Sequence, residues 1–281
     1  MDCIKTFEKT FPRISTMTVT ANWGTQINRD ILFRHLIHLM IPIWYPGEGI
    51  LKLEHNNTVC GASYKDLFTN RKTTGKTFFN QSTIVIRRRL TSGWKEVNMK
   101  LFANGGIQMT GIPSEEFAIQ TIHWLLAQIK IFSPSPFSGE VIITKISVPL
   151  INTDFTINKD IQQDILQNIL VDTYNLISTL EKTIYQGINM KYFFNSNNIN
   201  SGVCCCNSYC DGFGNGDGDG KCKRITVSIF RTGKIIITGA MNLKQINTAY
   251  DFICGVIDKY SDTVLIHKTK PLENISCGKC V

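Results

Sequence analysis

The sequence predicts an α+β fold in which two similar halves join into one continuous antiparallel sheet, with helices on one face. The main observation is a long-range repeat. Residues 102–125, FANGGIQMTGIPSEEFAIQTIHWL, return at 230–253 as FRTGKIIITGAMNLKQINTAYDFI. Phe, Gly, Ile, Thr and Gly recur in register at 102/230, 105/233, 107/235, 110/238 and 111/239. This separation far exceeds the roughly 20 to 50 residues of solenoid repeats and indicates two copies of a half-domain.

The second observation is that both halves predict the same order of elements, which is strand, helix, antiparallel strands and a final helix. The first strands mix β-branched and apolar residues, and the stretches after them carry apolar residues at helical spacing. The expected strands are 14–22 and 141–151, and the expected helices are 27–40 and 157–180. Thr156 or Asn158 is the expected N-cap of the second helix.

Each repeated segment predicts a hairpin followed by a helix. Gly105 and Gly233 supply the positive φ of the turns, after strands at 76–90 and 97–103 in one half and 187–195 and 223–230 in the other. Ser114 and Asn242 are the natural N-caps of the closing helices. Strand alternation places Gln108 and Thr110 on one face of the sheet and Met109 on the other, and the more apolar face should contact the helices.

Positive charge is concentrated in two blocks. The net charge is +8; residues 71–100 contain eight Lys or Arg and one acid, and residues 221–234 contain five Lys or Arg and no acid. A single block of this kind is most simply a solvated surface. Two blocks at equivalent positions of a repeat favour a polyanionic partner.

Export and membrane insertion are not predicted. The first 13 residues contain no apolar core of a signal peptide. The apolar run at 31–44 is interrupted by Arg34, His35, His38 and Pro42, and it is too short to span a bilayer. We therefore expect an intracellular protein that does not bind membranes.

The pattern F-x-x-G-K-I-x-x-T-G-A followed by a helix resembles the TATA-box-binding protein (TBP) family. FRTGKIIITGA matches it closely, whereas FANGGIQMTGI has Gly106 in place of Lys and Ile112 in place of Ala. The segment YQGINMKYF at 185–193 is similar to the family's F-P-G-L-I-Y-R-M. The resemblance covers about two thirds of the chain. The composition resembles that of the TBP-like proteins of large cytoplasmic DNA viruses.

The resemblance implies a saddle, which is a curved antiparallel sheet with helices on its convex face and DNA in contact with its underside. It implies an N-terminal tail at 1–12, a first repeat at 13–137, a second at 138–267 with a Cys/Gly-rich insertion at 195–222, and a C-terminal tail at 268–281. The implied function is a general initiation factor that binds and bends TATA or AT-rich promoter DNA through the minor groove. The implied partners are double-stranded DNA, a B-type initiation factor and RNA polymerase, in the nucleus, a cytoplasmic viral factory or the virion.

The resemblance also assigns residues. Aromatic wedges that kink the duplex would be Phe102 with Phe78 or Phe79 in the first half, and Phe230 with Tyr185 in the second. Thr110 and Thr238 would touch base edges. Phosphate contacts would come from Lys191, Arg231 and Lys234, with Arg87 and Arg89 as the first-half equivalents. The family has an Asn in the first strand of each half, where this chain has Thr16 and either Lys145 or Ile146.

These departures support an alternative, a TBP-fold scaffold that binds protein or RNA without bending a promoter. The two hypotheses differ in whether Phe102 and Phe230 are exposed among cations. No P-loop, Ser-His-Asp or paired-carboxylate motif is present, so we expect neither an enzyme nor a cofactor.

The insertion at 195–222 is long for a compact domain. The main zinc candidates in the insertion are Cys206, Cys210 and Cys222. Further candidates are Cys204 and Cys205, with Cys277 and Cys280 of the terminal CGKC. Only the terminal pair is a CxxC, so the spacing fits no standard CxxC…CxxC site. A mobile loop with reduced thiols is the expectation here, and zinc is the alternative.

Overall fold

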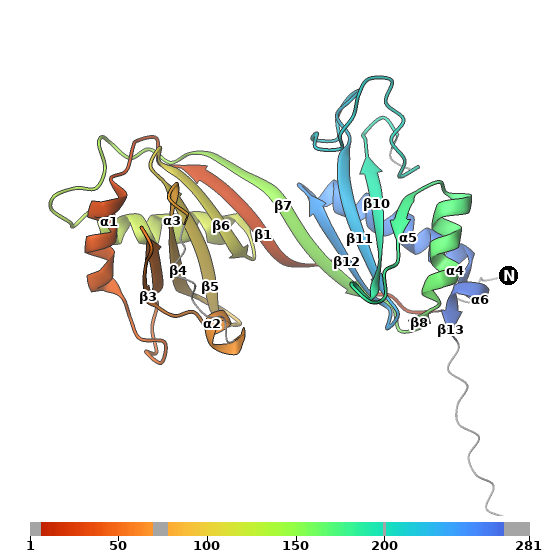
Figure 1. The fold of residues 1–281 in the computed structure, drawn as a ribbon, viewed down its shortest axis with the longest axis horizontal. Helices are drawn as coiled ribbons and strands as arrows, with labels where there is room; N and C mark the ends of the chain where they lie inside the picture. The colour runs from red at the N-terminus through yellow and green to blue at the C-terminus, as the bar shows by residue number, and fades with distance from the viewer. Residues whose placement is uncertain (1–6, 70–77, 199–200, 267–281) are drawn as a thin grey trace, which may run out of the picture. The chain divides into compact units, whose positions relative to one another are not determined.

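The computed structural model describes residues 7–69, 78–198 and 201–266, which form two units (Figure 1). The N-terminal unit comprises residues 14–152, and the C-terminal unit comprises residues 1–13 and 153–281. Strand β7 (Thr144–Thr156) carries the chain from one to the other. The sequence placed the boundary before this strand, between residues 137 and 138. The tail at 268–281 lies outside the described residues.

The N-terminal unit is a sheet with the strand order β3-β2-β4-β5-β6-β1-β7. The pairings of β2, β4, β5, β6 and β1 along this order are antiparallel. Its strands are β1 (Arg13–Asn22), β2 (Gly49–His55), β3 (Thr58–Gly61), β4 (Gln81–Leu90), β5 (Gly93–Phe102) and β6 (Gly106–Ile112). Its helices are α1 (Arg29–Leu36), a 3-10 turn η1 (Ile37–Leu39), α2 (Tyr64–Thr69) and α3 (Glu115–Ile129).

The core of this unit lies between the sheet and α3, which crosses the strands in Figure 1. Every second residue of β5 and β6 is buried there, including Met99, Ile107 and Met109. Ile122 and Leu125 of α3 cover them. The predicted separation of Met109 from Gln108 and Thr110 is confirmed.

The C-terminal unit has the strand order β7-β12-β11-β10-β9. Its strands are β9 (Ile177–Thr179), β10 (Gly187–Phe194), β11 (Lys223–Phe230) and β12 (Lys234–Ala240), and a separate pair joins β8 (Asp160–Ile161) to β13 (Leu265–Ile266). Its helices are α4 (Gln163–Asn168), a π-helical turn η2 (Ile169–Thr173), α5 (Leu243–Lys259) and α6 (Ser261–Val264). Ile246, Ile253 and Ile257 of α5 are buried with Ile235 and Ile237 of β12.

The predicted α+β class with antiparallel strands is confirmed, and so are both closing helices. The side chain of Ser114 accepts a hydrogen bond from the backbone N–H of Phe117, and that of Asn242 accepts one from Gln245. Both turn glycines have the expected positive φ of 81°. A Cβ at Gly233 would lie 2.3 Å from the carbonyl oxygen of Ile157, so this turn needs glycine for space as well as for φ.

The long helix predicted at 157–180 is wrong. This stretch contains β8, α4, the π-helical turn and β9, and α4 has only 6 residues. Tertiary pairing overrides the helical spacing, because Ile161 pairs with Leu265 and Ile177 pairs with Lys191. The N-cap is Gln162, without a side-chain hydrogen bond, and Asn158 instead accepts from the backbone of Glu8.

The helix expected at 27–40 is shorter, spanning α1 and η1 with Asn28 as its N-cap. The described part of the chain contains no helix long and apolar enough to cross a membrane.

We expect Ser114→Ala and Asn242→Ala each to lower the free energy of unfolding by about 1 kcal/mol, because each removes the acceptor for an N-terminal backbone N–H. Urea denaturation followed by circular dichroism measures the effect. Asn242→Asp keeps the side-chain acceptor and is the control. Equal midpoints for the Ala and Asp variants would show that the cap contributes nothing.

Candidate nucleic-acid interface

One row of polar residues crosses the outward face of the C-terminal unit. Lys191, Thr226 and Thr238 occupy neighbouring strands β10, β11 and β12 in direct register. Their neighbours along each strand, such as Val227 and Ile237, point into the core. Lys191 Nζ lies 2.9 Å from Thr226 Oγ1, so the ammonium donates a hydrogen bond along the row. The sequence-predicted Lys191 and Thr238 are thus brought together.

The pKa of Lys191 is lowered, first by partial burial and then by the positive charge of Arg224. A carboxylate partner for Lys191 is absent among the described ion pairs. An anion placed on this face would reverse both effects, because it would replace lost hydration and offset the charge of Arg224.

Two aromatic rings meet at the end of this face. The ring centroids of Tyr185 and Phe230 are 5.5 Å apart in an edge-on arrangement, and Tyr185 is 40% exposed. Gly187 pairs with Phe230 across the strands, and a Cβ there would lie 3.1 Å from Tyr185 and 3.2 Å from Phe230. The absence of a side chain at Gly187 therefore leaves room for both rings. The sequence-predicted wedge residues of this half form a contacting pair.

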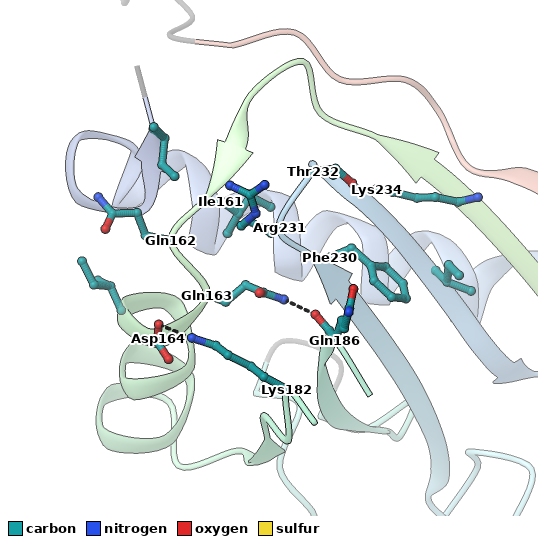
Figure 2. A pocket seen from close by; sticks show the side chains of 13 residues that line it. Ile161, Gln162, Gln163, Asp164, Lys182, Gln186, Phe230, Arg231, Thr232 and Lys234 are labelled. Atoms are coloured by element: carbon teal, nitrogen blue, oxygen red, sulfur yellow. Dashed lines mark hydrogen bonds and ion pairs between the residues drawn. The ribbon is translucent and has the colours of Figure 1, made fainter. Parts of the chain in front are cut away.

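The hairpin after Phe230 carries exposed cations. Figure 2 shows Phe230, Arg231, Thr232 and Lys234 along the β11–β12 hairpin, at the edge of a cleft of about 790 Å³. Arg231 and Lys234 are exposed, and the Arg231 guanidinium lies a long 3.9 Å from an oxygen of Asp160. The cleft wall is mixed: Lys182 Nζ lies 2.7 Å from an oxygen of Asp164, and isoleucines such as Ile236 form an apolar part.

The equivalent face of the N-terminal unit holds Phe102 and Thr110. Phe102 is partly exposed and lies on the same side of β5 as Asn98 and Lys100. Thr110 is paired with Asn98 on one side and Thr18 on the other. Phe102 therefore lies among polar and cationic neighbours on an outward face.

Phe78 and Phe79 are each 74% exposed. Within residues 78–198, neither has a ring contact with Phe102, and the carbonyl of Phe79 accepts a hydrogen bond from Arg29. The choice between them as the partner of Phe102 stays open.

Arg87 has a structural role. It is 3% exposed, and its guanidinium donates to the carbonyl oxygens of Ile43, Tyr45 and Gly47. Three of its five N–H donors thus hold the 41–48 loop, and the guanidinium is buried, so we remove Arg87 from the predicted phosphate contacts. Arg89 is exposed, with its guanidinium 5.3 Å from the centre of the Trp94 ring.

Helix α2 also covers part of the outward face of the N-terminal unit. Lys52 lies in register with Val85, on the side of the sheet opposite Ile84 and Ile86. Its ammonium is 2.7 Å from Glu54 and 3.0 Å from Asp66. Because Asp66 belongs to α2, this helix lies against the outward side of β2. Among the described residues, this helix therefore occupies part of the outward face.

Several residues on these faces were missed by the sequence reasoning, among them Asn98, Lys100 and Thr226. Strand alternation counted back from Thr110 across the hairpin turn would have identified Asn98, its register partner. Such a count needs the geometry of the turn, which the sequence alone does not give. The structure describes only part of the first basic block, residues 71–100, because residues 70–77 lie outside the described residues.

The chain is similar in part to known proteins. The model of the family described as transcription factor TFIID, or TATA-binding protein, matches residues 221–260, which contain β11, β12 and α5. The chain is 28% identical over 268 residues to a "TATA-box-binding protein-like" protein of Acanthamoeba polyphaga mimivirus, covering 90% of this chain and 67% of that protein. Among solved structures, Methanococcus jannaschii TBP aligns with a TM-score of 0.46 and 15% identity over 89% of this chain and 99% of that one.

The Asp66 contacts predict a pH-dependent stability. Burial by itself raises the pKa of Asp66, but hydrogen bonds from Ser63 and the Lys52 ammonium outweigh it and lower the pKa to about 2. The ordinary value is 3.8, so Asp66 stabilises the fold above about pH 4, and this contribution is lost as the pH falls toward 2. We expect Asp66→Asn to destabilise the protein by about 2 kcal/mol at pH 7.

Urea midpoints of wild type and variant, measured at pH 7 and near pH 3, test this expectation. The difference between the two proteins should shrink at the lower pH. Glu140→Gln, which changes an exposed carboxylate, is the control. A difference that stays constant with pH would rule out the proposed role of the Asp66 carboxylate.

Proposed function

We propose that the chain is a TBP-like protein that acts as a non-enzymatic, DNA-binding general transcription initiation factor. It binds double-stranded promoter DNA, TATA or AT-rich, through the minor groove and bends it. It then recruits RNA polymerase through a B-type initiation factor. The viral relative supports a viral transcription context, with the nucleus, a cytoplasmic factory or the virion as the place of action.

The contacting pair Tyr185 and Phe230, beside the Lys191–Thr226–Thr238 row, is the observation that carries this proposal. Minor-groove proteins insert apolar side chains between base steps and place Arg and Lys on the phosphates. Two rings over a glycine provide the wedge. Arg231 and Lys234 stand next to it, where phosphates flanking a kinked step would lie.

Base selectivity would come mainly from DNA deformability. Thr110 and Thr238 present hydroxyl groups to a groove whose pattern separates A·T from G·C pairs but little else. With Thr16 at the position of the family's Asn, direct readout at the centre of the site is reduced. Flexible TA steps that kink easily are therefore the preferred sites.

The scaffold hypothesis keeps one specific support. Residues 41–48 and α2 cover part of the outward face in the N-terminal unit, and Gly106 replaces a family Lys on the remaining part. A sheet face whose exposed area is reduced in this way suits a protein or RNA partner that contacts less of the sheet than a promoter duplex would. The two hypotheses are separated by whether the DNA is bent.

We expect wild type to bend short AT-rich duplexes labelled at both ends, seen as increased FRET, and to prefer them to GC-rich ones. Phe230→Ala with Tyr185→Ala should lower affinity about tenfold and abolish the FRET change, because no wedge remains to unstack a base step. Phe102→Ala tests the other half. Tyr209→Ala, which removes a ring 89% exposed on the insertion, is the control.

Binding without a FRET change in wild type would support only a basic nucleic-acid surface. Absence of binding at low salt would discard the promoter hypothesis in favour of the scaffold.

The phosphate contacts predict a salt effect. Lys234→Ala should weaken binding to all sequences and reduce the slope of log K against log salt by about 1, because one fewer counterion is released. Lys244→Ala removes an exposed cation from the first turn of α5 and should leave the slope unchanged. Fluorescence anisotropy over a salt series gives both slopes. Equal slopes for wild type and Lys234→Ala would exclude this contact.

A further inference from the structure

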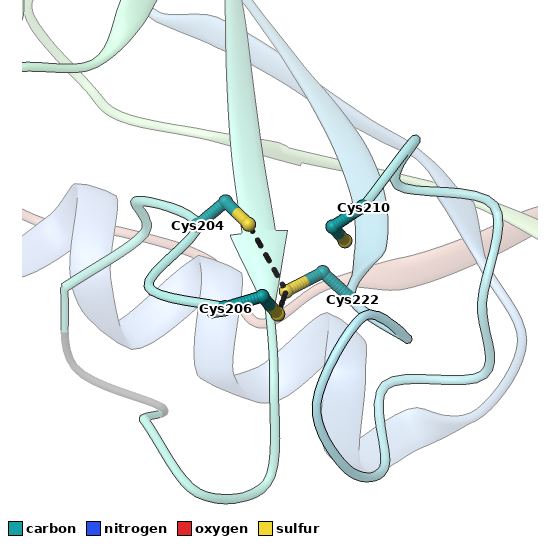
Figure 3. A group of neighbouring side chains, drawn as sticks. All are labelled: Cys204, Cys206, Cys210 and Cys222. Atoms are coloured by element: carbon teal, nitrogen blue, oxygen red, sulfur yellow. Dashed lines mark hydrogen bonds between the residues drawn. The ribbon is translucent and has the colours of Figure 1, made fainter. Parts of the chain in front are cut away.

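Four cysteines of the insertion between β10 and β11 come together. The Sγ atoms of Cys204, Cys206, Cys210 and Cys222 all lie within 4.8 Å of one another, and Figure 3 shows their side chains converging. Cys222 Sγ is 3.4 Å from that of Cys206 and 3.8 Å from that of Cys204. The expectation of a loop with unassociated thiols does not account for this convergence.

These distances suit a single tetrahedral metal ion. Zinc bound by four thiolates has Zn–S bonds of about 2.3 Å, and tetrahedral angles then place the sulfur atoms about 3.8 Å apart. Two disulfides would instead divide the four residues into two separate pairs with S–S bonds of about 2 Å. Cys222 approaches two different cysteines here, so the cluster does not resolve into pairs.

The surroundings of the cluster are those of a supported metal site. Asn195, 8% exposed at the end of β10, directs its side-chain Nδ2 to Cys222 Sγ at 3.5 Å and to the carbonyl of Gly218 at 2.8 Å. Hydrogen bonds to ligand sulfur stabilise a thiolate and orient it. Cys222 is itself buried, at the residue before β11 begins.

The neighbouring Cys205 is excluded by geometry. It is exposed, and its Sγ lies 3.6 Å from the carbonyl of Val203. The ligand pattern is therefore C-x-C-x3-C-x11-C, which differs from paired CxxC motifs and explains why spacing alone did not identify it. Cys277 and Cys280 lie outside the described residues.

We propose that Cys204, Cys206, Cys210 and Cys222 bind one Zn²⁺ as a structural site that fixes the insertion to the start of β11. Zinc displaces the thiol protons, which pass to solvent, and the four thiolates fill its coordination, so no position is open for catalysis. No electron transfer is involved.

The site would order one edge of the outward face. The backbone N–H of Arg224, two residues after Cys222, donates to the carbonyl of Gly212 at 2.7 Å, and its guanidinium lies 4.8 Å from the centre of the Phe213 ring. Gly212 also packs on Phe193, where an added Cβ would lie 2.9 Å from the ring. A metal holding Cys210 and Cys222 would hold this segment on β10 and β11.

Elemental analysis of the full chain, purified with reductant and without chelator, tests the proposal. We expect one zinc per chain in wild type and in Cys205→Ser, the matched control within the same tripeptide. Cys206→Ser and Cys210→Ser should retain less than about 0.2 zinc per chain, because three thiolates bind zinc far more weakly. Replacement by Co²⁺ should give the visible bands of tetrahedral thiolate coordination in wild type and Cys205→Ser.

Other outcomes would overturn the proposal. Wild type could be free of zinc and fail to take up Zn²⁺ or Co²⁺, or it could contain iron in place of zinc. Mass spectrometry under non-reducing conditions could show the cysteines paired as disulfides. Cys205→Ser could lose as much zinc as Cys206→Ser and Cys210→Ser. Since a Ser variant can fail to fold, far-UV circular dichroism is recorded for each, and metal release from wild type by chelator gives an independent measurement. None of these measurements involves DNA, so the result stands apart from the proposed function.

Discussion

The alternation of side chains along β5, β6, β11 and β12 is the constraint on which the rest of this structure depends. Each strand buries every second residue under α3 or α5, so Met109 and Ile237 are fully buried. The intervening residues must then face outward, whatever their chemistry. Slipping either hairpin by one residue would expose the isoleucines and bury Lys100 or Lys234, so burial of the core also fixes the candidate interface.

The two units use their outward faces differently. In the C-terminal unit the face keeps an aromatic pair, a hydrogen-bonded polar row and exposed cations. In the N-terminal unit, Arg87 and Lys52 use their charges to hold residues 41–48 and α2. The same residue type thus serves packing in one case and an exposed surface in the other, according to which carbonyls and carboxylates surround it.

The insertion shows how a segment without regular strands is organised. Short side-chain contacts substitute for a sheet: Asp219 accepts from the backbone N–H groups of Asn207 and Ser208, and Gln245 of α5 donates to the carbonyl of Asn215. These contacts hold the segment near the thiol cluster. A metal ion bound by the four cysteines would add strong coordinate bonds to this segment, which buries little apolar surface.

The sequence by itself determined the fold class, both hairpins and both closing helices, because turn glycines, N-caps and hydrophobic periodicity act within a few residues of one another. Strand alternation also placed Thr110 and Thr238 on the outward face, whereas the role of Phe230 came from the family resemblance and stays a prediction. Tertiary structure decided the rest. The helical spacing at 157–180 gave way to strand pairing of Ile161 and Ile177, and the environment of Arg87 depended on a loop about 40 residues earlier. The convergence of Cys204 and Cys222 likewise depended on how the insertion folds back, because long-range contacts leave no periodic trace in sequence.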